Sequence, residues 1–338
     1  MPAIVTIGSA VRDITFLTDK GRVIKTPENL TAQSLLAFEY GAKIKSDEVY
    51  LNFGGGACNT ATTFVELGIE TSVNCKVGND SEGEAVIKNL EKIGIKTDLV
   101  QISENKKTGF ALVVINKNEG EGERVIFVHK GASGDLEIRK DDLNKSEWIY
   151  LTALAGKWEE GLNEINKIIE ENKIKLAWNP GATQISAGKN KIAELLRNTE
   201  ILIINKDEAI ELVQSDKNVK LDYNEINDAV ILCRIIKSWG PKTVIITDGI
   251  NGAYLFDGGK NVLFSSATSK DRVDTTGAGD SFGSALVGGY MLTGDLETAL
   301  KYGIINAGNV VSERGAQNGI LNKKEIEEKL GRVKVSYL

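Results

Sequence analysis

Short apolar runs alternate with amphipathic stretches along most of the 338-residue chain. The apolar runs are short enough for buried strands, and the stretches between them repeat apolar residues at helical spacing. Strands are predicted at 3–8, 49–53, 71–77, 148–151, 174–178, 201–204, 244–247, 253–256 and 262–264. Helices are predicted at 57–67, 81–93, 158–171, 192–196, 207–213, 226–239 and from Ala278 onward. This alternation indicates an α/β protein with a central, mostly parallel sheet flanked by helices.

Two ranges, about 14–53 and 97–128, depart from the alternation because they hold consecutive strand-like runs with few helices. In the second range these runs are 99–102, 110–115 and 125–128. Such ranges predict a small β-sheet that stands apart from the main one, for instance as a lid. No long linker, low-complexity tract or internal repeat divides the chain, so residues 1–338 are expected to form a single domain.

The segment Asp274–Asp280, with the sequence DTTGAGD, is the most informative motif. Gly277 and Gly279 allow the backbone to approach a ligand closely, and the helix that follows offers free N–H groups to an anion. Asp280 would repel a phosphate there unless a metal or the chemistry requires both. An ordinary helix start, capped by Thr276 and with Asp280 favouring the dipole, is the alternative for this segment alone.

A second glycine-rich segment, Gly54-Gly55-Gly56, follows a predicted strand and opens a predicted helix that carries Asn59. The segment exposes backbone at a sheet edge, where ligands of α/β proteins usually bind. A plain strand-to-helix turn would need only one or two of these glycines.

Two segments in the second half of the chain allow more than one interpretation. Asn205 and Glu208 share a helix face and could hold the water shell of Mg²⁺, although a capping box is favoured on this segment alone. Thr247–Gly252 joins two strand-like runs. A hairpin turn explains it well, and a nucleotide lying against its glycines is the weaker alternative.

Composition and missing motifs remove several classes of protein. The net charge of −6, with both signs interspersed, argues against non-specific nucleic-acid binding. The single histidine, His129, excludes histidine triads and multi-histidine metal sites, and no P-loop or GxGxxG fingerprint is present. Three scattered cysteines, no apolar run near membrane-spanning length and no secretory signal before the first strand lead us to expect a cytoplasmic protein without membrane partners.

Taken together, the segments resemble the motifs of the ribokinase-like (PfkB) sugar and nucleoside kinases, in the same order and along nearly the whole chain. Asp274–Asp280 looks like the C-terminal signature of that family, and Gly54–Asn59 with its helix looks like the N-terminal one. Asn205–Glu208 fits the N-x-x-E motif, and Thr247–Gly252 fits the T-x-G-x-x-G nucleotide strand. Gly8–Asp13 resembles the opening segment, whose aspartate binds substrate hydroxyls. The resemblance implies the three-layer ribokinase-like fold with a small β-sheet lid.

The resemblance also implies a reaction, in which ATP donates its γ-phosphoryl group to a primary hydroxyl. Asp280 would accept the hydroxyl proton, and the N–H groups of Gly277, Ala278 and Gly279 would form the anion hole. An ordinary aspartate, with a pKa of about 3.9, is a weak base for an alcohol. Little base strength is needed if the transition state is loose and the proton leaves late.

The cofactors implied by the resemblance are ATP, Mg²⁺ and, in many family members, K⁺. Asn205 and Glu208 would act on Mg²⁺ and phosphate, with Glu208 reaching the metal through water. The residues expected on the nucleotide side are Thr247, Gly249 and Gly252, with Asn306 and Ala307 near the adenine. The residues expected at a K⁺ site are Asp274 and Thr276, closed by the Arg314–Ala316 loop.

The phosphoryl acceptor is less closely defined. Asp13, Gly55, Gly56 and Asn59 match the family's substrate-binding segments. Ribokinases usually carry Asn where this chain has Val11, Lys where it has Gly56, and Glu where it has Thr152, so ribose itself is in doubt. Nucleosides, fructose-like sugars and keto-deoxy sugar acids stay open, and Arg12 is a weak candidate for binding an acid.

Two further expectations complete the interpretation of the sequence. A non-catalytic sugar or nucleotide sensor of the same fold is the alternative to a kinase, but Asp280 and the glycines before it are all retained. A nicotinamide-dependent dehydrogenase is disfavoured by the missing fingerprint. The small lid sheet could leave an apolar face that a second subunit covers, so a homodimer through the lid is expected.

Overall fold

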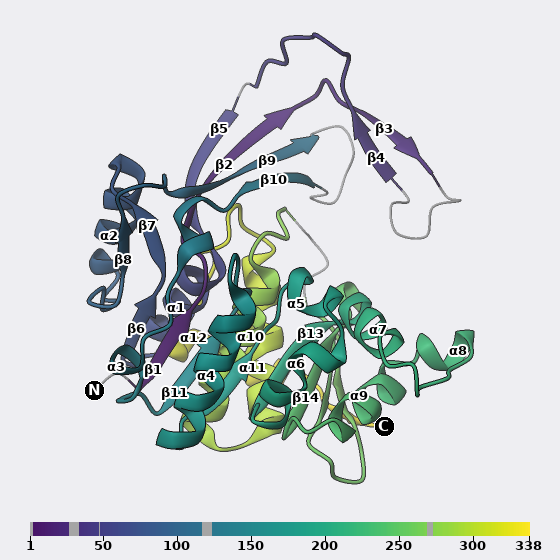
Figure 1. The fold of residues 1–338 in the computed structure, drawn as a ribbon. Coiled ribbons are helices and arrows are strands. Elements are labelled where there is room, and N and C mark those ends of the chain that lie inside the picture. Colours follow the sequence, from purple (N-terminus) through teal and green to yellow (C-terminus); the bar gives the residue numbers. More distant parts are fainter. Residues whose placement is uncertain (1–2, 27–33, 47, 117–123, 269–272) are drawn as a thin grey trace.

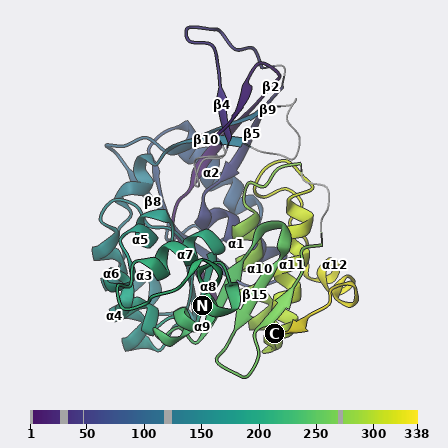
Figure 2. The ribbon, with the colours of Figure 1, turned by 90° about the vertical axis from the view of Figure 1, so that its right-hand side faces the viewer.

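The computed structural model describes residues 3–26, 34–46, 48–116, 124–268 and 273–338. Its main body has three layers, a central sheet between two layers of helices, and a smaller sheet arches over one edge of this body (Figures 1 and 2). None of the described helices is both long and apolar enough to cross a membrane.

The central sheet has nine strands in the order β17-β16-β15-β14-β13-β12-β11-β1-β6. The strands from β14 to β6 run parallel, and β15, β16 and β17 are added antiparallel. The strands are β1 (Ile4–Ile7), β6 (Thr71–Asn74), β11 (Trp148–Leu151), β12 (Lys175–Trp178), β13 (Ile201–Asn205), β14 (Thr243–Thr247), β15 (Ala253–Phe256), β16 (Leu263–Ser265) and β17 (Ser336–Tyr337). The prediction of a mostly parallel α/β sheet is therefore confirmed.

Helices cover both faces of this sheet and bury a separate apolar core on each. One core lies under α3 (Lys140–Leu143), α4 (Trp158–Asn172), α5 (Ala182–Ser186), α6 (Lys189–Arg197), α7 (Lys206–Gln214) and α9 (Ala229–Ser238). The other lies under α1 (Gly56–Glu66), α10 (Ala278–Thr293), α11 (Leu296–Val310) and α12 (Lys323–Glu327). Helix α2 (Ser81–Lys92) packs with α1 on a third, smaller core through Val86 and Leu90. The remaining elements are α8 (Tyr223–Ile226) and the 3₁₀ turns at Gly131–Asp135, Gly249–Asn251 and Leu330–Arg332.

At strand β1 the order in which successive strands are added to the sheet changes direction. The chain first passes from β1 outward to β6, and later returns to β11 on the other side of β1 before continuing to β14. In open α/β sheets a crevice for ligands forms beyond the carboxyl ends of the strands at such a point. Gly8 follows β1 and Thr152 follows β11, so the fold places these residues at the expected position for a site.

The smaller sheet has four strands in the order β10-β9-β2-β5. They are β2 (Val11–Thr18), β5 (Glu48–Gly54), β9 (Gly109–Asn116) and β10 (Arg124–His129). Arg12, Ile14 and Phe16 point to one face and Val11, Asp13 and Thr15 to the other, which is the more buried face. A hairpin of β3 (Arg22–Lys25) and β4 (Ser34–Ala37) extends from this sheet (Figure 1).

The structure differs from the predicted elements at several boundaries. The predicted strand 71–77 is split, because β7 (Lys76–Gly78) leaves the main sheet and pairs with β8 (Gln101–Ser103). The run predicted at 99–102 therefore does not join the small sheet. The predicted helix 226–239 is also split, because the Asp228 carboxylate caps a new helix by accepting hydrogen bonds from the N–H groups of Val230 and Ile231.

Candidate active site

Two cavities lie at the carboxyl edge of the main sheet and meet at Asp280. The first has a volume of about 380 Å³ and is lined by the ends of β11 to β14 and by the start of α10. The second has a volume of about 340 Å³ and lies between the main body and the small sheet. The described residues that line both are Ser9, Gly56, Arg124, Ala153, Gly277 and Asp280.

Asp280 lies in the first turn of α10, and that helix does not start as an ordinary capped helix. The residue at the cap position is Gly277, in the left-handed conformation with φ of 76°, and no side chain caps the helix. Thr276 instead donates its N–H and its hydroxyl to Asp274 Oδ1, at 2.8 and 2.6 Å. A Cβ on Gly277 would lie 2.6 Å from the Ala316 side chain. Gly277 is therefore required by both conformation and space.

Asn59 holds the Asp280 carboxylate. Its Nδ2 donates a hydrogen bond of 2.8 Å to Asp280 Oδ2, while its Oδ1 accepts one of 3.1 Å from Gln317 Nε2. Burial raises the pKa of Asp280, and the hydrogen bond from Asn59 opposes that increase. Asn59 was predicted to bind substrate. The structure places it in the second cavity, with both ends of its amide already engaged.

Asp13 lies on the inner face of β2 and lines the second cavity. Burial, together with repulsion from Asp274 and Asp280, raises its pKa to about 7, and the charge of Arg12 acts in the opposite direction. Asp13 and Asp280, two carboxylates with raised pKa values, thus line one cavity, as is typical of a functional site.

At each of the three consecutive glycines, a side chain would collide with a different neighbouring group. A Cβ on Gly54 would overlap the Asp13 carboxylate. Gly55 has φ of 96°, and a Cβ there would overlap the Ser9 carbonyl. A Cβ on Gly56 would lie 2.7 Å from Thr152 Oγ1. The turn therefore brings α1, β2 and β11 together closely enough to surround the second cavity.

The capping box at Asn205 and Glu208 is formed. The Glu208 N–H donates to Asn205 Oδ1 at 2.8 Å, and the Asn205 N–H donates to Glu208 Oε2 at 2.9 Å. Both residues also line the first cavity, and burial raises the pKa of Glu208. The capping interpretation is correct. The Glu208 carboxylate lies at the cavity wall as well as in the capping box. Among the described residues, no three His, Cys, Asp or Glu side chains are grouped to hold a metal.

The residues predicted on the nucleotide side are only partly brought to the first cavity. Thr247 lines it, whereas Gly249 and Gly252 line neither central cavity. Gly252 has φ of 119° and closes the turn between β14 and β15, so the hairpin interpretation accounts for it.

Asn306 is fully buried on α11 and is fixed within the protein. Its side chain donates to the Ser281 carbonyl and accepts from the Leu321 N–H, both at 3.0 Å. Asn306 therefore has a structural role, and its approach to an adenine stays a prediction. Its neighbours Ile305 and Gly308 line a wider hollow of about 700 Å³, and Ala307 is half-buried beside them.

Asp274 joins the signature turn to the loop that follows α11. Its Oδ1 accepts from Thr276, as described, and its Oδ2 accepts from the Gly315 N–H at 2.9 Å. Arg314 of the same loop donates to Tyr50 of β5 at 2.5 Å. The Arg314–Ala316 loop therefore contacts both the signature turn and the small sheet, and its closure of a K⁺ site stays a prediction.

The predicted basic contact does not lie in either cavity. Arg12 points to the outer face of the small sheet, where it pairs with Glu82 at 2.8 Å and lies over the Phe53 ring. His129 is exposed at the end of β10 and packs against Phe110. The cations that do line the second cavity are Arg124 and Lys130, and neither was predicted. No motif marks them, because both flank a strand that was identified by its apolar residues alone.

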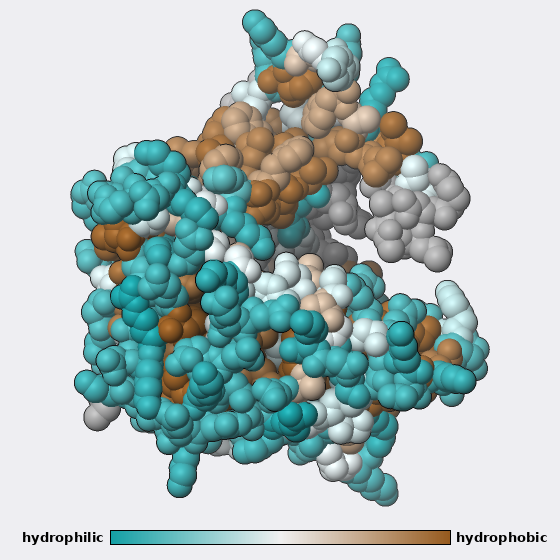
Figure 3. Space-filling model, viewed as in Figure 1, coloured by the Kyte–Doolittle hydropathy of each residue, from teal (hydrophilic) through white to brown (hydrophobic). Residues whose placement is uncertain are grey.

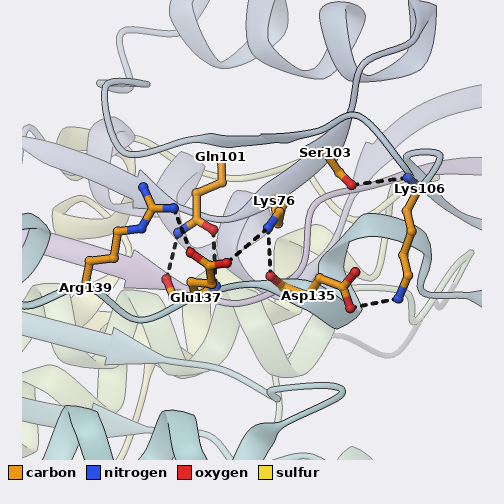
Figure 4. A network of polar contacts seen from close by, with 7 residues as sticks. All are labelled: Lys76, Gln101, Ser103, Lys106, Asp135, Glu137 and Arg139. Carbon is orange, nitrogen blue, oxygen red and sulfur yellow. Dashed lines mark hydrogen bonds and ion pairs between the residues drawn. The ribbon is translucent and has the colours of Figure 1, made fainter.

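A polar network fixes the segment after β10, as Figure 4 shows. Lys76 Nζ donates to the Asp135 carbonyl at 3.0 Å, and Gln101 exchanges two hydrogen bonds with the backbone of Glu137, at 2.7 and 3.1 Å. Leu136 lies between these anchors and forms part of the wall of the second cavity. The network therefore holds that wall against the strand pair β7–β8.

Comparison with known proteins defines the class. The model of the pfkB family of carbohydrate kinases matches residues 1–323, so the chain belongs to this family. A protein described as an uncharacterized sugar kinase of Archaeoglobus fulgidus is 30% identical over 259 residues, which cover 75% of this chain and 96% of that one.

Solved structures show the same fold. The nucleoside kinase of Methanocaldococcus jannaschii superposes with a TM-score of 0.75 at 22% identity, and the alignment covers 98% of both chains. Arabidopsis thaliana ribokinase, complexed with ribose and ATP, superposes with a TM-score of 0.78 at 21% identity, covering 97% of this chain and 98% of that one. The chain is thus a ribokinase-family kinase of the sugar and nucleoside type, a phosphotransferase with an alcohol group as acceptor.

Proposed function

We propose that the protein transfers the γ-phosphoryl group of ATP to a primary hydroxyl of a sugar or nucleoside, with Asp280 as the base. The observation that carries this proposal is the position of Asp280 and Gly277 where the two cavities meet. ATP would reach this junction from the first cavity and the acceptor from the second.

Asp280 would receive the proton of the acceptor hydroxyl while the oxygen of that hydroxyl forms a bond to the γ-phosphorus. The bond from that phosphorus to the bridging oxygen breaks, and ADP leaves. Burial raises the pKa of Asp280, which makes it a better proton acceptor than a solvated aspartate. The N–H groups of Gly277, at the cap position, and of Ala278 and Gly279, the first residues of α10, lie at the helix terminus that favours negative charge and would form the anion hole.

Glu208 and Asn205 fit a role at the phosphate-bound Mg²⁺, since both line the first cavity and hard cations prefer oxygen ligands. Mg²⁺ would neutralise charge on the phosphates, and Glu208 would reach it through water. Asp274 and Thr276 would hold K⁺ beside the anion hole. If activity is indifferent to exchanging K⁺ for Na⁺ or Tris, the K⁺ site is to be dropped.

The second cavity favours an acceptor with both polar and apolar surface. Its lining combines the polar Asp13 and Asn59 with the apolar side chains of Val11, Ile126 and Leu136. An amphipathic acceptor such as a nucleoside would place its sugar hydroxyls at Asp13 and its base against these apolar side chains. A bare sugar would leave much of this apolar surface in contact with water.

A panel of acceptors tests the proposal. ADP release is followed with ATP, Mg²⁺ and, in turn, nucleosides, pentoses, ketohexoses and keto-deoxy sugar acids. We expect turnover with at least one acceptor, and the highest kcat/KM with a nucleoside. Protein that binds ATP but releases no ADP with any acceptor would support the sensor instead.

The outer face of the small sheet supports the homodimer that the sequence predicts. Across the four strands, the registers align the rows Leu51–Ile14–Leu112–Phe127 and Val49–Phe16–Val114–Val125. Leu51 and Phe127 are about 60% exposed, and apolar side chains gather over this sheet in Figure 3. A contiguous apolar face of this kind is typical of a subunit interface. We propose that a second copy of the chain covers it.

A further inference from the structure

Tyr150 is a buried residue of β11 whose hydroxyl the fold leaves unpaired. Its side chain is fully buried, and its ring packs edge-on against Phe64 of α1, with the ring centroids 5.6 Å apart. Among the described residues, no group forms a hydrogen bond with this hydroxyl. An unpaired buried hydroxyl costs stability, and phenylalanine would fill nearly the same volume without that cost. The hydroxyl therefore needs an explanation other than packing.

The hydroxyl lies against α10, one turn after the proposed base. A Cβ on Gly283 would overlap the Tyr150 hydroxyl, so the lack of a side chain at Gly283 makes room for it. Asp280 and Gly283 are three residues apart on α10, and such positions share a helix face at a spacing of about 5–6 Å. The same Cβ would lie 3.2 Å from Ile203, which lines the first cavity. The hydroxyl therefore lies beside that cavity, about one helical turn from Asp280.

The charge of Asp280 acts on this hydroxyl. Burial raises the pKa of Tyr150 well above its ordinary value, and the negative charge of Asp280 acts in the same direction. Tyr150 therefore keeps its proton at neutral pH and presents an O–H group with no other acceptor. In a low-dielectric interior, such a dipole is oriented by the charge that acts on it. For Tyr150 that charge is the Asp280 carboxylate.

We propose that Tyr150 is a positioning residue for the base: its hydroxyl directs its proton toward the Asp280 carboxylate and, together with the amide of Asn59, stabilises the charged form of that carboxylate. This inference rests on the proposed role of Asp280 in the kinase reaction. Asn59 binds Asp280 Oδ2 from α1, whereas Tyr150 acts from β11. Burial alone would leave more of Asp280 protonated, and a protonated carboxyl group cannot accept the proton of a hydroxyl. Tyr150 itself transfers no proton and forms no covalent bond.

Other titratable groups surround Asp280, and a test has to separate them from Tyr150. These groups are Asp13 of β2, Cys58 of α1, Glu208 of α7, Arg124 of β10, Lys130 after β10, and Asp274. Arg124 donates a hydrogen bond to Thr275 Oγ1, and the pKa of Asp13 is raised to about 7. A titration followed through activity alone would combine several of these groups. The Asp280 carboxylate is therefore best observed directly.

Carbon-13 NMR of the full chain, labelled at its aspartate carboxyl groups, observes this carboxylate without any substrate. The Asp280 resonance is the one missing from Asp280→Asn, and Asp13→Asn identifies the resonance of the other raised carboxylate. We expect the titration midpoint of Asp280 to move to higher pH in Tyr150→Phe, because a dipole that favours the charged form has been removed. Tyr302→Phe is the matched control, since it removes a buried tyrosine hydroxyl that is paired with Glu327 at 3.2 Å. The control should leave the Asp280 midpoint unchanged.

Activity and stability distinguish this role from packing. With the best acceptor from the panel, Tyr150→Phe should lower kcat/KM by about threefold or more on the acidic limb. At alkaline pH, where Asp280 is charged in both proteins, the difference should become smaller. The melting temperature of Tyr150→Phe should equal or exceed that of the wild type, because an unpaired buried hydroxyl is removed. Tyr302→Phe should show the reverse, a lower melting temperature with an unchanged pH profile.

The proposal fails if Asp280 titrates at the same pH in Tyr150→Phe as in the wild type. An unchanged midpoint together with a lower melting temperature would show that the hydroxyl serves packing only. Wild-type protein that phosphorylates no acceptor overturns the proposed function instead. Because the NMR titration needs no turnover, the two failures are distinguishable.

Discussion

At the scale of single residues, the site is dominated by carboxylates that the fold forces together. Asp13, Asp274 and Asp280 are close enough for the last two to raise the pKa of the first. Such an arrangement costs stability, because at neutral pH the folded state must hold charge that water would solvate better. Functional sites often carry a cost of this kind, and it leads to a measurable consequence.

Replacing Asp13 by Asn should stabilise the protein at alkaline pH. The folded-state pKa of Asp13 is raised to about 7 from 3.8, so its contribution to stability is present at low pH and is lost as pH rises between these values. Asp13→Asn removes that loss, and at pH 8 the free energy of unfolding should increase by up to about 4 kcal/mol. Urea unfolding at pH 5 and pH 8 measures the effect. If Asp13→Asn is no more stable than the wild type at pH 8, this account is contradicted. Binding of the acceptor should weaken in the same variant.

Asn59 should control the pH at which Asp280 becomes a base. Its hydrogen bond lowers the pKa of Asp280, against the effect of burial. In Asn59→Leu that pKa should rise, so the acidic limb of kcat/KM should move to higher pH. Gln317→Leu is the matched control, because it removes the other partner of Asn59 without touching Asp280. A limb that stays in place in Asn59→Leu would show that Asn59 does not tune the base.

Glu208 allows a charge to be removed while the helix cap is kept. Gln at this position can still accept from the Asn205 N–H, so Glu208→Gln should leave the melting temperature nearly unchanged. If Glu208 acts on Mg²⁺ through water, the Mg²⁺ concentration for half-maximal activity should rise by about tenfold. An unchanged Mg²⁺ requirement would leave only the capping role.

At the scale of elements, the small sheet has two faces with different tasks. Its inner face carries Asp13, Ile126 and Arg124 into the site, while its outer face presents exposed apolar rows. A single strand such as β10 serves both, because neighbouring side chains point to opposite faces.

Charge introduced on the outer face should separate the subunits. Leu51→Lys places a cation in the middle of the apolar rows, and light scattering coupled to size-exclusion chromatography should show a shift from dimer to monomer. Ile24→Lys on β3, a similarly exposed apolar residue of the separate hairpin, should leave the mass unchanged. A wild-type monomer, or a Leu51→Lys dimer, would contradict the proposed interface.

The sequence predicted these elements to different degrees, for physical reasons. Buried parallel strands such as 201–204 are uniformly apolar and are easily recognised. The start of β2 at Val11 was missed because its pairing with Gly54 and Gly109 is long-range and leaves no local pattern. The split at Asp228 was missed because one capping side chain decides it.

At the scale of the whole molecule, the candidate site depends on contacts between segments far apart in the chain. Asp280 and the glycines before it could be identified from local sequence, because a helix start that needs φ > 0 has a recognisable composition. Asn59 is 221 residues from Asp280 and 258 residues from Gln317 along the chain, and Arg124 is 151 residues from Thr275. Only the three-dimensional fold reveals such contacts.

The central claim is that Asp280 is the base at the junction of the two cavities. The most direct test is the rate of ADP release by Asp280→Asn, with the best acceptor, beside an Asp207→Asn control on the exposed side of α7. We predict that Asp280→Asn lowers kcat by about 10²–10⁴-fold while ATP binds with nearly wild-type affinity, and that Asp207→Asn has no effect. Turnover by Asp280→Asn at the wild-type rate would contradict the account.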